Sequence, residues 1–170
     1  PRAYTTDYRI FGEHDIWNTK NYGYKLEGSV TLRSALVKSL NLPTIGLVED
    51  LGPQRLINYS RKLGISATMD KNLTIGLGSF SVTLEEMIEA YGVLANQGQR
   101  VDPVFVTKIE DAHGNILEAN GNPSEKIISE ETAFLVTDAM RDVVDLGTGV
   151  RAKAIGRPSA GKTGTTNDSK

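Results

Sequence analysis

Residues 160–166 (AGKTGTT) constrain this chain more than any other stretch, because they join a cation, several hydroxyls and two glycines. The threonines favour an extended backbone, and the glycines let another group approach the main chain closely. Alternate side chains of a strand share a face, so we expect Thr163 and Thr165 on one face and Lys162 and Gly164 on the other. The N–H groups of such an edge strand suit an oxyanion, and its hydroxyls and ammonium suit a carboxylate. The stretch therefore predicts a site for an anionic acyl donor.

Two short motifs overlap this stretch and indicate other chemistry. Residues 156–163 fit the phosphate-loop pattern GxxxxGK[ST], which cradles phosphate only where a helix follows at once. The residues after Thr163 are poor helix formers, which disfavours this nucleotide-binding alternative. Ser159 and Lys162 fit the SxxK pattern, but residues three apart are neighbours on a helix and face opposite sides of a strand. We therefore do not expect Ser159 to be a nucleophile.

The composition excludes several classes of protein. The chain has 170 residues, enough for one domain with a hydrophobic core. Its net charge is −2 without a basic run, which disfavours a nucleic-acid partner. Cysteine is absent, so disulfides and thiolate chemistry are excluded, and without a metal-binding motif we expect no metal and no cofactor. No apolar run is long enough to span a membrane, so any membrane anchor is expected outside this segment.

Two helices are expected to meet near Ser39 and Asn41. Thr31 suits the N-cap of the first helix, whose apolar residues recur at helical spacing. That helix should end at or before Leu42, because Pro43 disfavours a helical conformation in the residue before it. Pro43 in turn suits the first turn of a second helix. Ser39 and Asn41 thus lie at a helix end, where such residues usually only hydrogen-bond the last carbonyls.

The remaining pattern predicts further helices and a hairpin. Helices are expected over residues 43–51, over residues 53–63, from a capping box at Thr83 up to Gly98, and between Ser129 and Gly147. The inward faces of the last two are expected to comprise Leu84, Met87, Ile88, Tyr91, Leu94 and Ala95, and Ala133, Val136, Thr137, Met140, Val143 and Val144. His113 and Gly114 should form the turn of the hairpin. Residues 1–28 show no regular period and are expected to be irregular and partly extended.

Two motifs of the penicillin-recognising serine acyltransferases are present, SxN at residues 39–41 and KTG at residues 162–164. Three longer blocks resemble the transpeptidase domain of class A (bifunctional) penicillin-binding proteins: YKLEGSVTLRSALVKSLN (24–41), IGLGSFSVTLEEMIEAYGVLANQG (75–98) and AGKTGTT (160–166). The resemblance runs from about Trp17 to Thr166. It implies an α+β fold of the serine β-lactamase/D,D-transpeptidase type, an α/β sandwich with an antiparallel sheet flanked by helices and a helical subdomain.

The resemblance also implies roles for the residues of the SxN motif and for the lysine of KTG. Ser39 would relay a proton toward the leaving amine. Lys162 would shape the electrostatic field of the cleft and assist that proton transfer. Asn41 would hydrogen-bond the amide chain of the substrate.

The rest of the KTG block would bind the donor's terminal carboxylate. The hydroxyls of Thr163 and Thr165 would hold this group, and Gly164 belongs to the same substrate-binding stretch. The Thr165 N–H would be one donor of the oxyanion hole, a role worth about 3–4 kcal/mol in comparable sites.

The implied activity is that of a peptidoglycan D,D-transpeptidase on the extracytoplasmic face of the bacterial cell membrane. In this family a serine attacks the D-Ala-D-Ala carbonyl of a stem peptide, releases D-Ala and passes the acyl group to an amine of a second stem peptide. β-Lactam antibiotics imitate the donor and acylate the serine. A serine β-lactamase or a β-lactam sensor shares these motifs and is the alternative.

The sequence departs from the family because it holds no acceptable SxxK motif. In the family the nucleophilic serine and its base lysine precede SxN, which here means before residue 1, and further strands follow the KTG strand. We therefore expect residues 1–170 to be the central part of a penicillin-binding transpeptidase domain. The fragment alone should be a non-enzymatic scaffold, and the remainder of the same protein should complete it as a separate chain or segment.

Overall fold

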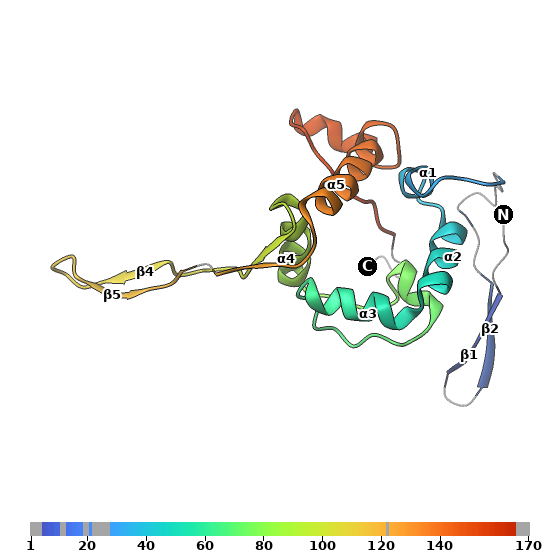
Figure 1. Ribbon diagram of the computed structural model, residues 1–170, viewed down its shortest axis with the longest axis horizontal. Coiled ribbons are helices and arrows are strands. Elements are labelled where there is room, and N and C mark those ends of the chain that lie inside the picture. The colour runs from blue at the N-terminus through green and yellow to red at the C-terminus, as the bar shows by residue number, and fades with distance from the viewer. Residues whose placement is uncertain (1–4, 11–12, 19–20, 22–27, 122, 166–170) are drawn as a thin grey trace. The chain divides into compact units, whose positions relative to one another are not determined.

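The computed structural model describes residues 5–10, 13–18, 21, 28–121 and 123–165, and it gives the side chains of residues 21, 28–121 and 123–165. The chain forms two compact units, whose helices and strands are labelled in Figure 1 where there is room. The first unit comprises Pro1–Tyr59, Ala67–Ser81 and Leu135–Lys170, and the second comprises Ser60–Ser66 and Val82–Phe134. Two helices, α3 (Pro53–Lys62) and α5 (Glu130–Asp145), begin in one unit and end in the other.

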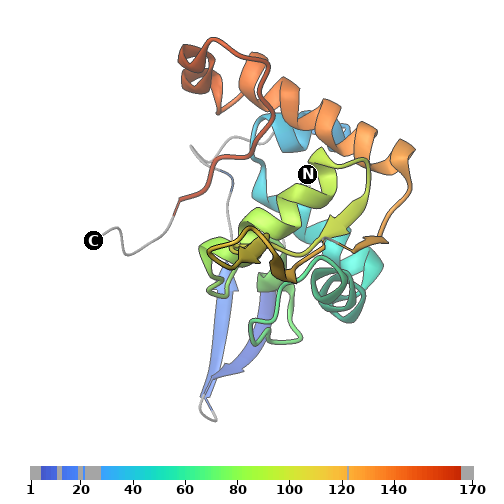
Figure 2. The same cartoon turned by 90° about the vertical axis from the view of Figure 1, so that its left-hand side faces the viewer.

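The first unit carries a hairpin and short helices. Its elements are β1 (Thr5–Ile10), β2 (Glu13–Asn18), α1 (Leu32–Val37), α2 (Asn41–Leu51) and the 3-10 helices η2 (Leu73–Leu77) and η3 (Val150–Ile155). The β1–β2 pair is antiparallel with a regular register and is seen as a two-stranded ribbon in Figure 2. The expectation of an irregular, partly extended segment is therefore wrong for residues 5–10 and 13–18 in one respect, because these extended residues form regularly paired strands. The backbone N–H and C=O groups of two paired strands satisfy each other whether or not apolar and polar side chains alternate. The side-chain pattern of the sequence therefore did not reveal these strands.

The two helices expected around Pro43 are confirmed. The Thr31 hydroxyl caps α1 by accepting a hydrogen bond from Ser34 N at 3.1 Å. Pro43 lies in the first turn of α2, which needs no donor there, and α2 ends at Leu51 as expected. Helix α2 begins at Asn41, two residues before the expected start, so Leu42 is helical although a proline follows it. Asn41 therefore lies at the start of α2 and not at the end of α1.

Helix α2 packs against η2, and their contact leaves no room for a side chain at Gly76. A Cβ at Gly76 would lie 2.6 Å from Val48 Cγ2. The buried apolar residues of this unit are Ala35, Leu40, Leu42, Ile45, Val48, Ile75, Met140, Val143 and Val144. Arg33 on α1 also bridges two carboxylates of α5, those of Asp138 at 2.6 Å and Asp142 at 2.5 Å. These contacts join α1, α2 and the C-terminal half of α5 in one core.

The second unit contains α4 (Leu84–Ala95), β3 (Gln99–Val101), β4 (Lys108–Glu110), β5 (Ile116–Ala119) and β6 (Ser124–Lys126). The expected capping box opens α4, with Glu86 N donating to Thr83 Oγ1 and Thr83 N donating to the Glu86 carboxylate. Ser66 donates two further bonds to that carboxylate, through its N–H at 2.6 Å and its hydroxyl at 2.7 Å. The bonds from Thr83 and Ser66 lower the pKa of Glu86 to about 2.

The inward face expected for α4 is largely wrong. Leu84, Ile88 and Tyr91 are 77%, 60% and 38% exposed, whereas Ala90 and Val93 are buried. The helix has apolar residues on more than one face, and within this unit it packs against β3. A helix face is covered only where a neighbour packs on it, and the described residues leave most of the face predicted by the periodicity uncovered.

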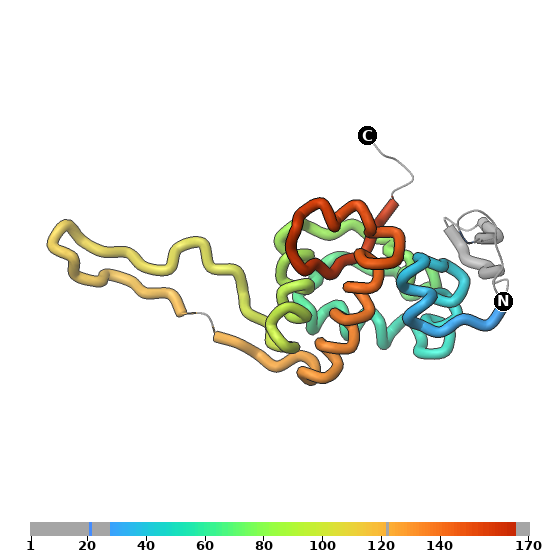
Figure 3. Tube along the Cα trace, turned by 90° about the horizontal axis from the view of Figure 1, so that it is seen from above, coloured from blue at the N-terminus to red at the C-terminus, as the bar shows by residue number. Residues whose placement is uncertain are grey.

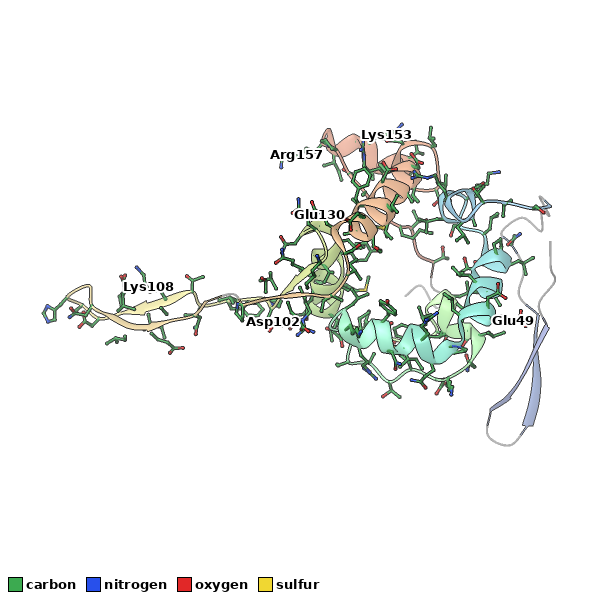
Figure 4. All side chains as sticks on the ribbon, in the orientation of Figure 1. Glu49, Asp102, Lys108, Glu130, Lys153 and Arg157 are labelled. Carbon is green, nitrogen blue, oxygen red and sulfur yellow. The ribbon has the colours of Figure 1, made fainter. Side chains whose placement is uncertain are left out.

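The hairpin expected at His113 and Gly114 is confirmed. Strands β3 and β6 pair at its base and β4 and β5 pair near its tip, forming the long two-stranded arm drawn in yellow and orange in Figure 3. At the tip, the Asn115 side-chain amide donates to Asp111 Oδ2 at 2.8 Å, and the N–H groups of Asn115 and His113 donate to Asp111 Oδ1. These bonds, the side-chain bond of Asn115 first, lower the pKa of Asp111. Lys108 lies on this arm and pairs with Glu110 at 2.6 Å (Figure 4).

Helix α5 follows the predicted pattern at both ends. Ser129 Oγ accepts a hydrogen bond from Thr132 N at 3.2 Å, and the helix ends at Asp145, before Gly147. Of the expected inward residues, Ala133, Met140, Val143 and Val144 are buried. The Lys153 ammonium, seen beyond the helix in Figure 4, donates to Asp145 O at 2.7 Å and so satisfies one of the last carbonyls.

Candidate active site

Ser39 lies at the corner between α1 and α2, which Figure 1 shows meeting end to end. Its backbone has a φ of 54°, in the left-handed region that residues other than glycine rarely adopt. Such a conformation costs about 1–3 kcal/mol and is found mainly where the surroundings enforce it. Here Ser39 N donates to Leu36 O at 3.1 Å, and Leu40 N donates to Ala35 O at 2.9 Å. The corner therefore fixes the backbone from which the Ser39 side chain projects.

The ammonium of Lys162 has three hydrogen-bond acceptors among the described residues. It donates to Ser39 Oγ at 2.8 Å, to Thr163 O at 2.8 Å and to Thr163 Oγ1 at 3.3 Å. An ammonium has three protons, so these acceptors match its donors. The expected meeting of Ser39 with Lys162 is confirmed. The roles inferred for the two residues stay predictions.

Burial lowers the pKa of Lys162 from its ordinary value of 10.5. Among the described residues no carboxylate forms an ion pair with this ammonium, so no opposite charge there offsets the loss of hydration. The Lys162 ammonium therefore loses its proton to give a neutral amine more readily than the ammonium of an exposed lysine does. Such an amine next to the Ser39 hydroxyl is suited to exchange a proton with it.

Lys162 to Thr165 do not form the expected strand. These residues are irregular, and no described strand pairs with them. The segment is instead held to α5 by a hydrogen bond from Gly161 N to Met140 O at 3.3 Å. The expected separation of Lys162 and Thr163 on opposite faces is also wrong, because the long lysine side chain turns back to its neighbour's hydroxyl. A strand requires a partner for its backbone groups, and the short stretch alone could not specify one.

The sequence reasoning missed Thr148 as a member of the site. The hydroxyl oxygens of Thr148 and Thr163 are 2.7 Å apart. Residues 147–149 form a Gly-Thr-Gly turn, which the sequence indicated only as the end of α5. The signal that could have indicated Thr148 was its place between two glycines. Glycines often mark a position where the backbone packs closely against another segment, and such packing brings the side chain between them near that segment.

The other expected site residues lie on the same two segments. Asn41 is the first residue of α2 and is partly buried. Gly164 and Thr165 continue the irregular segment and are exposed, and Thr166 lies outside the described residues. A Cβ added at Gly161 or Gly164 would meet no described atom within 4 Å. A ligand can therefore approach the main chain at these glycines.

The two overlapping motifs form neither a phosphate loop nor a serine–lysine pair. Described residues 156–165 contain no helix after the GxxxxGK[ST] pattern, so no helix N-terminus follows it. Ser159 donates its hydroxyl proton to Arg157 O at 2.9 Å, whereas Lys162 donates to Ser39. Among all the residues that the structure describes, no group of three or more His, Asp or Glu side chains could hold a metal ion. No helix among them has the length and hydropathy needed to cross a membrane.

Residues 4–170 match the family model described as the penicillin binding protein transpeptidase domain. The chain belongs to this family. Penicillin-binding protein 1A of Rickettsia bellii (strain RML369-C) is 36% identical over 177 residues, which cover 91% of this chain and 22% of that protein. The chain thus spans about a fifth of the length of this transpeptidase relative.

Solved structures share the fold of this member of the transpeptidase domain family. Penicillin-binding protein 1A from Haemophilus influenzae has a TM-score of 0.84 at 23% identity, covering 98% of this chain and 31% of that one. The D,D-transpeptidase domain of a peptidoglycan glycosyltransferase from Eggerthella lenta has a TM-score of 0.75 at 21% identity, covering 99% and 48%. The expected α+β transpeptidase fold is confirmed, and the described residues contribute helices and three two-stranded antiparallel sheets to it.

Proposed function

We propose that this chain is the central part of a class A penicillin-binding protein's transpeptidase domain, and that the complete protein cross-links peptidoglycan. The observation that carries the proposal is the 2.8 Å hydrogen bond from Lys162 Nζ to Ser39 Oγ. It joins the SxN and KTG motifs in one site within one compact unit. The family match over residues 4–170 supports the same reaction.

The reaction is a serine-type acyl transfer. A nucleophilic serine outside these residues attacks the carbonyl of the D-Ala-D-Ala bond, and the C–N bond to the terminal D-Ala breaks. The proton of the nucleophilic serine passes to its base lysine, also outside these residues, and the leaving amine takes a proton through Ser39. The acceptor amine then attacks the acyl-serine ester, the C–O bond to the serine breaks, and the base lysine returns its proton to the serine oxygen. The proton given up by the acceptor amine restores the pair of Ser39 with Lys162. The lowered pKa of Lys162 supports this exchange, because proton transfer is most efficient between groups whose affinities are not far apart.

The irregular KTG segment holds the donor. The hydroxyls of Thr163 and Thr165 bind its terminal carboxylate, and the open side of Gly164 lets the donor lie against the main chain. Thr165 N–H is one donor of the oxyanion hole. Asn41, at the start of α2, hydrogen-bonds the amide of the stem peptide.

The remainder of the same protein supplies the SxxK segment and the strands beside KTG. The substrates are peptidoglycan stem peptides, β-lactams acylate the same serine, and the reaction takes place on the extracytoplasmic face of the cell membrane. The exposed apolar side chains Leu84 and Ile88 on α4 support this completion, because such a face is usually covered in a finished domain.

The test uses the full-length protein with fluorescent penicillin and with a D-Ala-D-Ala stem peptide. Covalent labelling and release of D-Ala are expected, and Lys162→Ala should reduce both. Lys153→Ala is the matched control, because this lysine only caps α5 through Asp145 O. Rapid hydrolysis of a chromogenic cephalosporin would instead favour a β-lactamase, and unlabelled full-length protein would refute the proposal.

A further inference from the structure

The turn after α5 joins three segments that are distant in sequence. Thr148 N donates to Val37 O at 3.3 Å, at the last residue of α1 and two residues before Ser39. The Thr148 hydroxyl lies 2.7 Å from the hydroxyl of Thr163. Gly147 N and Gly149 N both donate to Val143 O, at 3.1 and 2.9 Å, so the turn is anchored on α5.

The glycines on either side of Thr148 make this contact possible. A Cβ at Gly147 would lie 2.3 Å from Val37 O and 2.9 Å from Val37 Cγ1. A Cβ at Gly149 would lie 3.1 Å from Val143 O. The turn therefore packs its bare backbone on α1 and α5, which leaves the Thr148 side chain facing the KTG segment.

Counting protons shows what Thr148 does to Thr163. A hydroxyl has one proton to donate and two lone pairs that accept. The Lys162 ammonium donates to Thr163 Oγ1 at 3.3 Å and occupies one lone pair. If the Thr148 hydroxyl donates to the second lone pair across 2.7 Å, the proton of Thr163 is left for a ligand.

We propose that Thr148 is a positioning residue, which donates to Thr163 Oγ1 and thereby turns the Thr163 proton toward the carboxylate of the bound donor. The proposal rests on the function proposed above, which gives Thr163 that carboxylate. Thr148 does not touch the substrate, and it acts only through the orientation of its neighbour. Because the same turn bonds Val37 O beside the Ser39 corner, it also keeps the distance between the two motifs constant.

The test compares acylation of the full-length protein by benzylpenicillin and by its methyl ester, which lacks the carboxylate charge. Thr148→Val should slow acylation by benzylpenicillin about three- to tenfold, the size expected for one lost orienting hydrogen bond. Thr148→Ser keeps the hydroxyl and should stay within about twofold of wild type. With the methyl ester, Thr148→Val and wild type should react at nearly equal rates.

An unchanged acylation rate of Thr148→Val with benzylpenicillin would overturn the proposal. An equal loss of rate with benzylpenicillin and with its methyl ester would also overturn it, because it would mean a general structural role. Thr148→Ala removes the same hydroxyl with less bulk and replaces Thr148→Val if that variant does not fold. In a Thr163→Val background, Thr148→Val should have no further effect, and an additive loss would contradict the coupling. Wild type that reacts with neither compound would refute the proposed function itself, and with it this inference.

Discussion

Lys162 Nζ donates a hydrogen bond to Ser39 Oγ at 2.8 Å, although 123 positions separate the two residues. Both groups are held before any ligand arrives. Ser39 is fixed by a left-handed backbone at a helix corner, and Lys162 by two further acceptors on Thr163. Preorganisation of this kind would reduce the rearrangement that the proposed reaction requires.

Replacing Ser39 with alanine separates a proton-transfer role from a structural one. If Ser39 transfers a proton, Ser39→Ala in the full-length protein should slow acylation by about 10²–10⁴-fold. Ser39→Gly is the matched control, because it removes the same hydroxyl but adopts positive φ freely. Both variants should lose activity alike, whereas glycine should be more stable than alanine by about 1 kcal/mol in urea unfolding. A loss of rate below about threefold would leave Ser39 a structural residue.

The partly buried ammonium of Lys162 should make stability depend on pH. Its pKa is lower in the folded protein than the ordinary 10.5, so between the two values the unfolded chain binds more protons. The free energy of unfolding of wild type, relative to Lys162→Met, should therefore rise as the pH increases through this window toward 10.5. Lys162→Arg should lack this rise, because a guanidinium keeps its proton. Urea unfolding of the full-length protein at several pH values measures the difference, and parallel wild-type and Arg curves would contradict the prediction.

Gly147 and Gly92 should respond in opposite ways to alanine. A Cβ at Gly147 meets the Val37 carbonyl at 2.3 Å, so Gly147→Ala should destabilise the protein by about 1–3 kcal/mol, as overpacking does. Gly92 lies within α4, and a Cβ there meets no described atom outside the local helix backbone within 4 Å. Gly92→Ala should stabilise the protein by about 0.5–1 kcal/mol. Thermal unfolding of both variants checks the prediction. Equal shifts of the melting temperature would contradict it, because they would mean that the structure accommodates a Cβ at Gly147 beside Val37 without loss of stability.

The capping box of α4 should lose its charge-dependent stabilisation in acid. The pKa of Glu86 is about 2 in the folded protein and 4.5 ordinarily, because Thr83 and Ser66 donate to its carboxylate. A lowered pKa stabilises the fold above the ordinary value, and this contribution is lost as the pH falls from 4.5 toward 2. The stability advantage of wild type over Glu86→Gln should therefore shrink across this range in urea unfolding. An advantage that does not change with pH would contradict the assignment.

Local rules of the sequence determined much of this fold. Thr31 predicted the start of α1, Pro43 predicted the first turn of α2, Thr83 and Glu86 predicted the start of α4, and Gly114 predicted the hairpin tip. Each prediction depends on torsions or hydrogen bonds within about four residues, which the local sequence specifies. The SxN and KTG motifs likewise indicated which residues to place in the candidate site.

Only the tertiary structure decided which of these residues meet. The residues next to Lys162 in the sequence do not specify that its ammonium donates a hydrogen bond to Ser39. Those next to Thr148 likewise do not specify that its hydroxyl bonds that of Thr163. The same holds for the irregular course of the KTG segment and for the face of α4 that is buried. Such contacts follow from how the helices share one core, and that arrangement is set by burial summed over the whole unit, which no short stretch encodes.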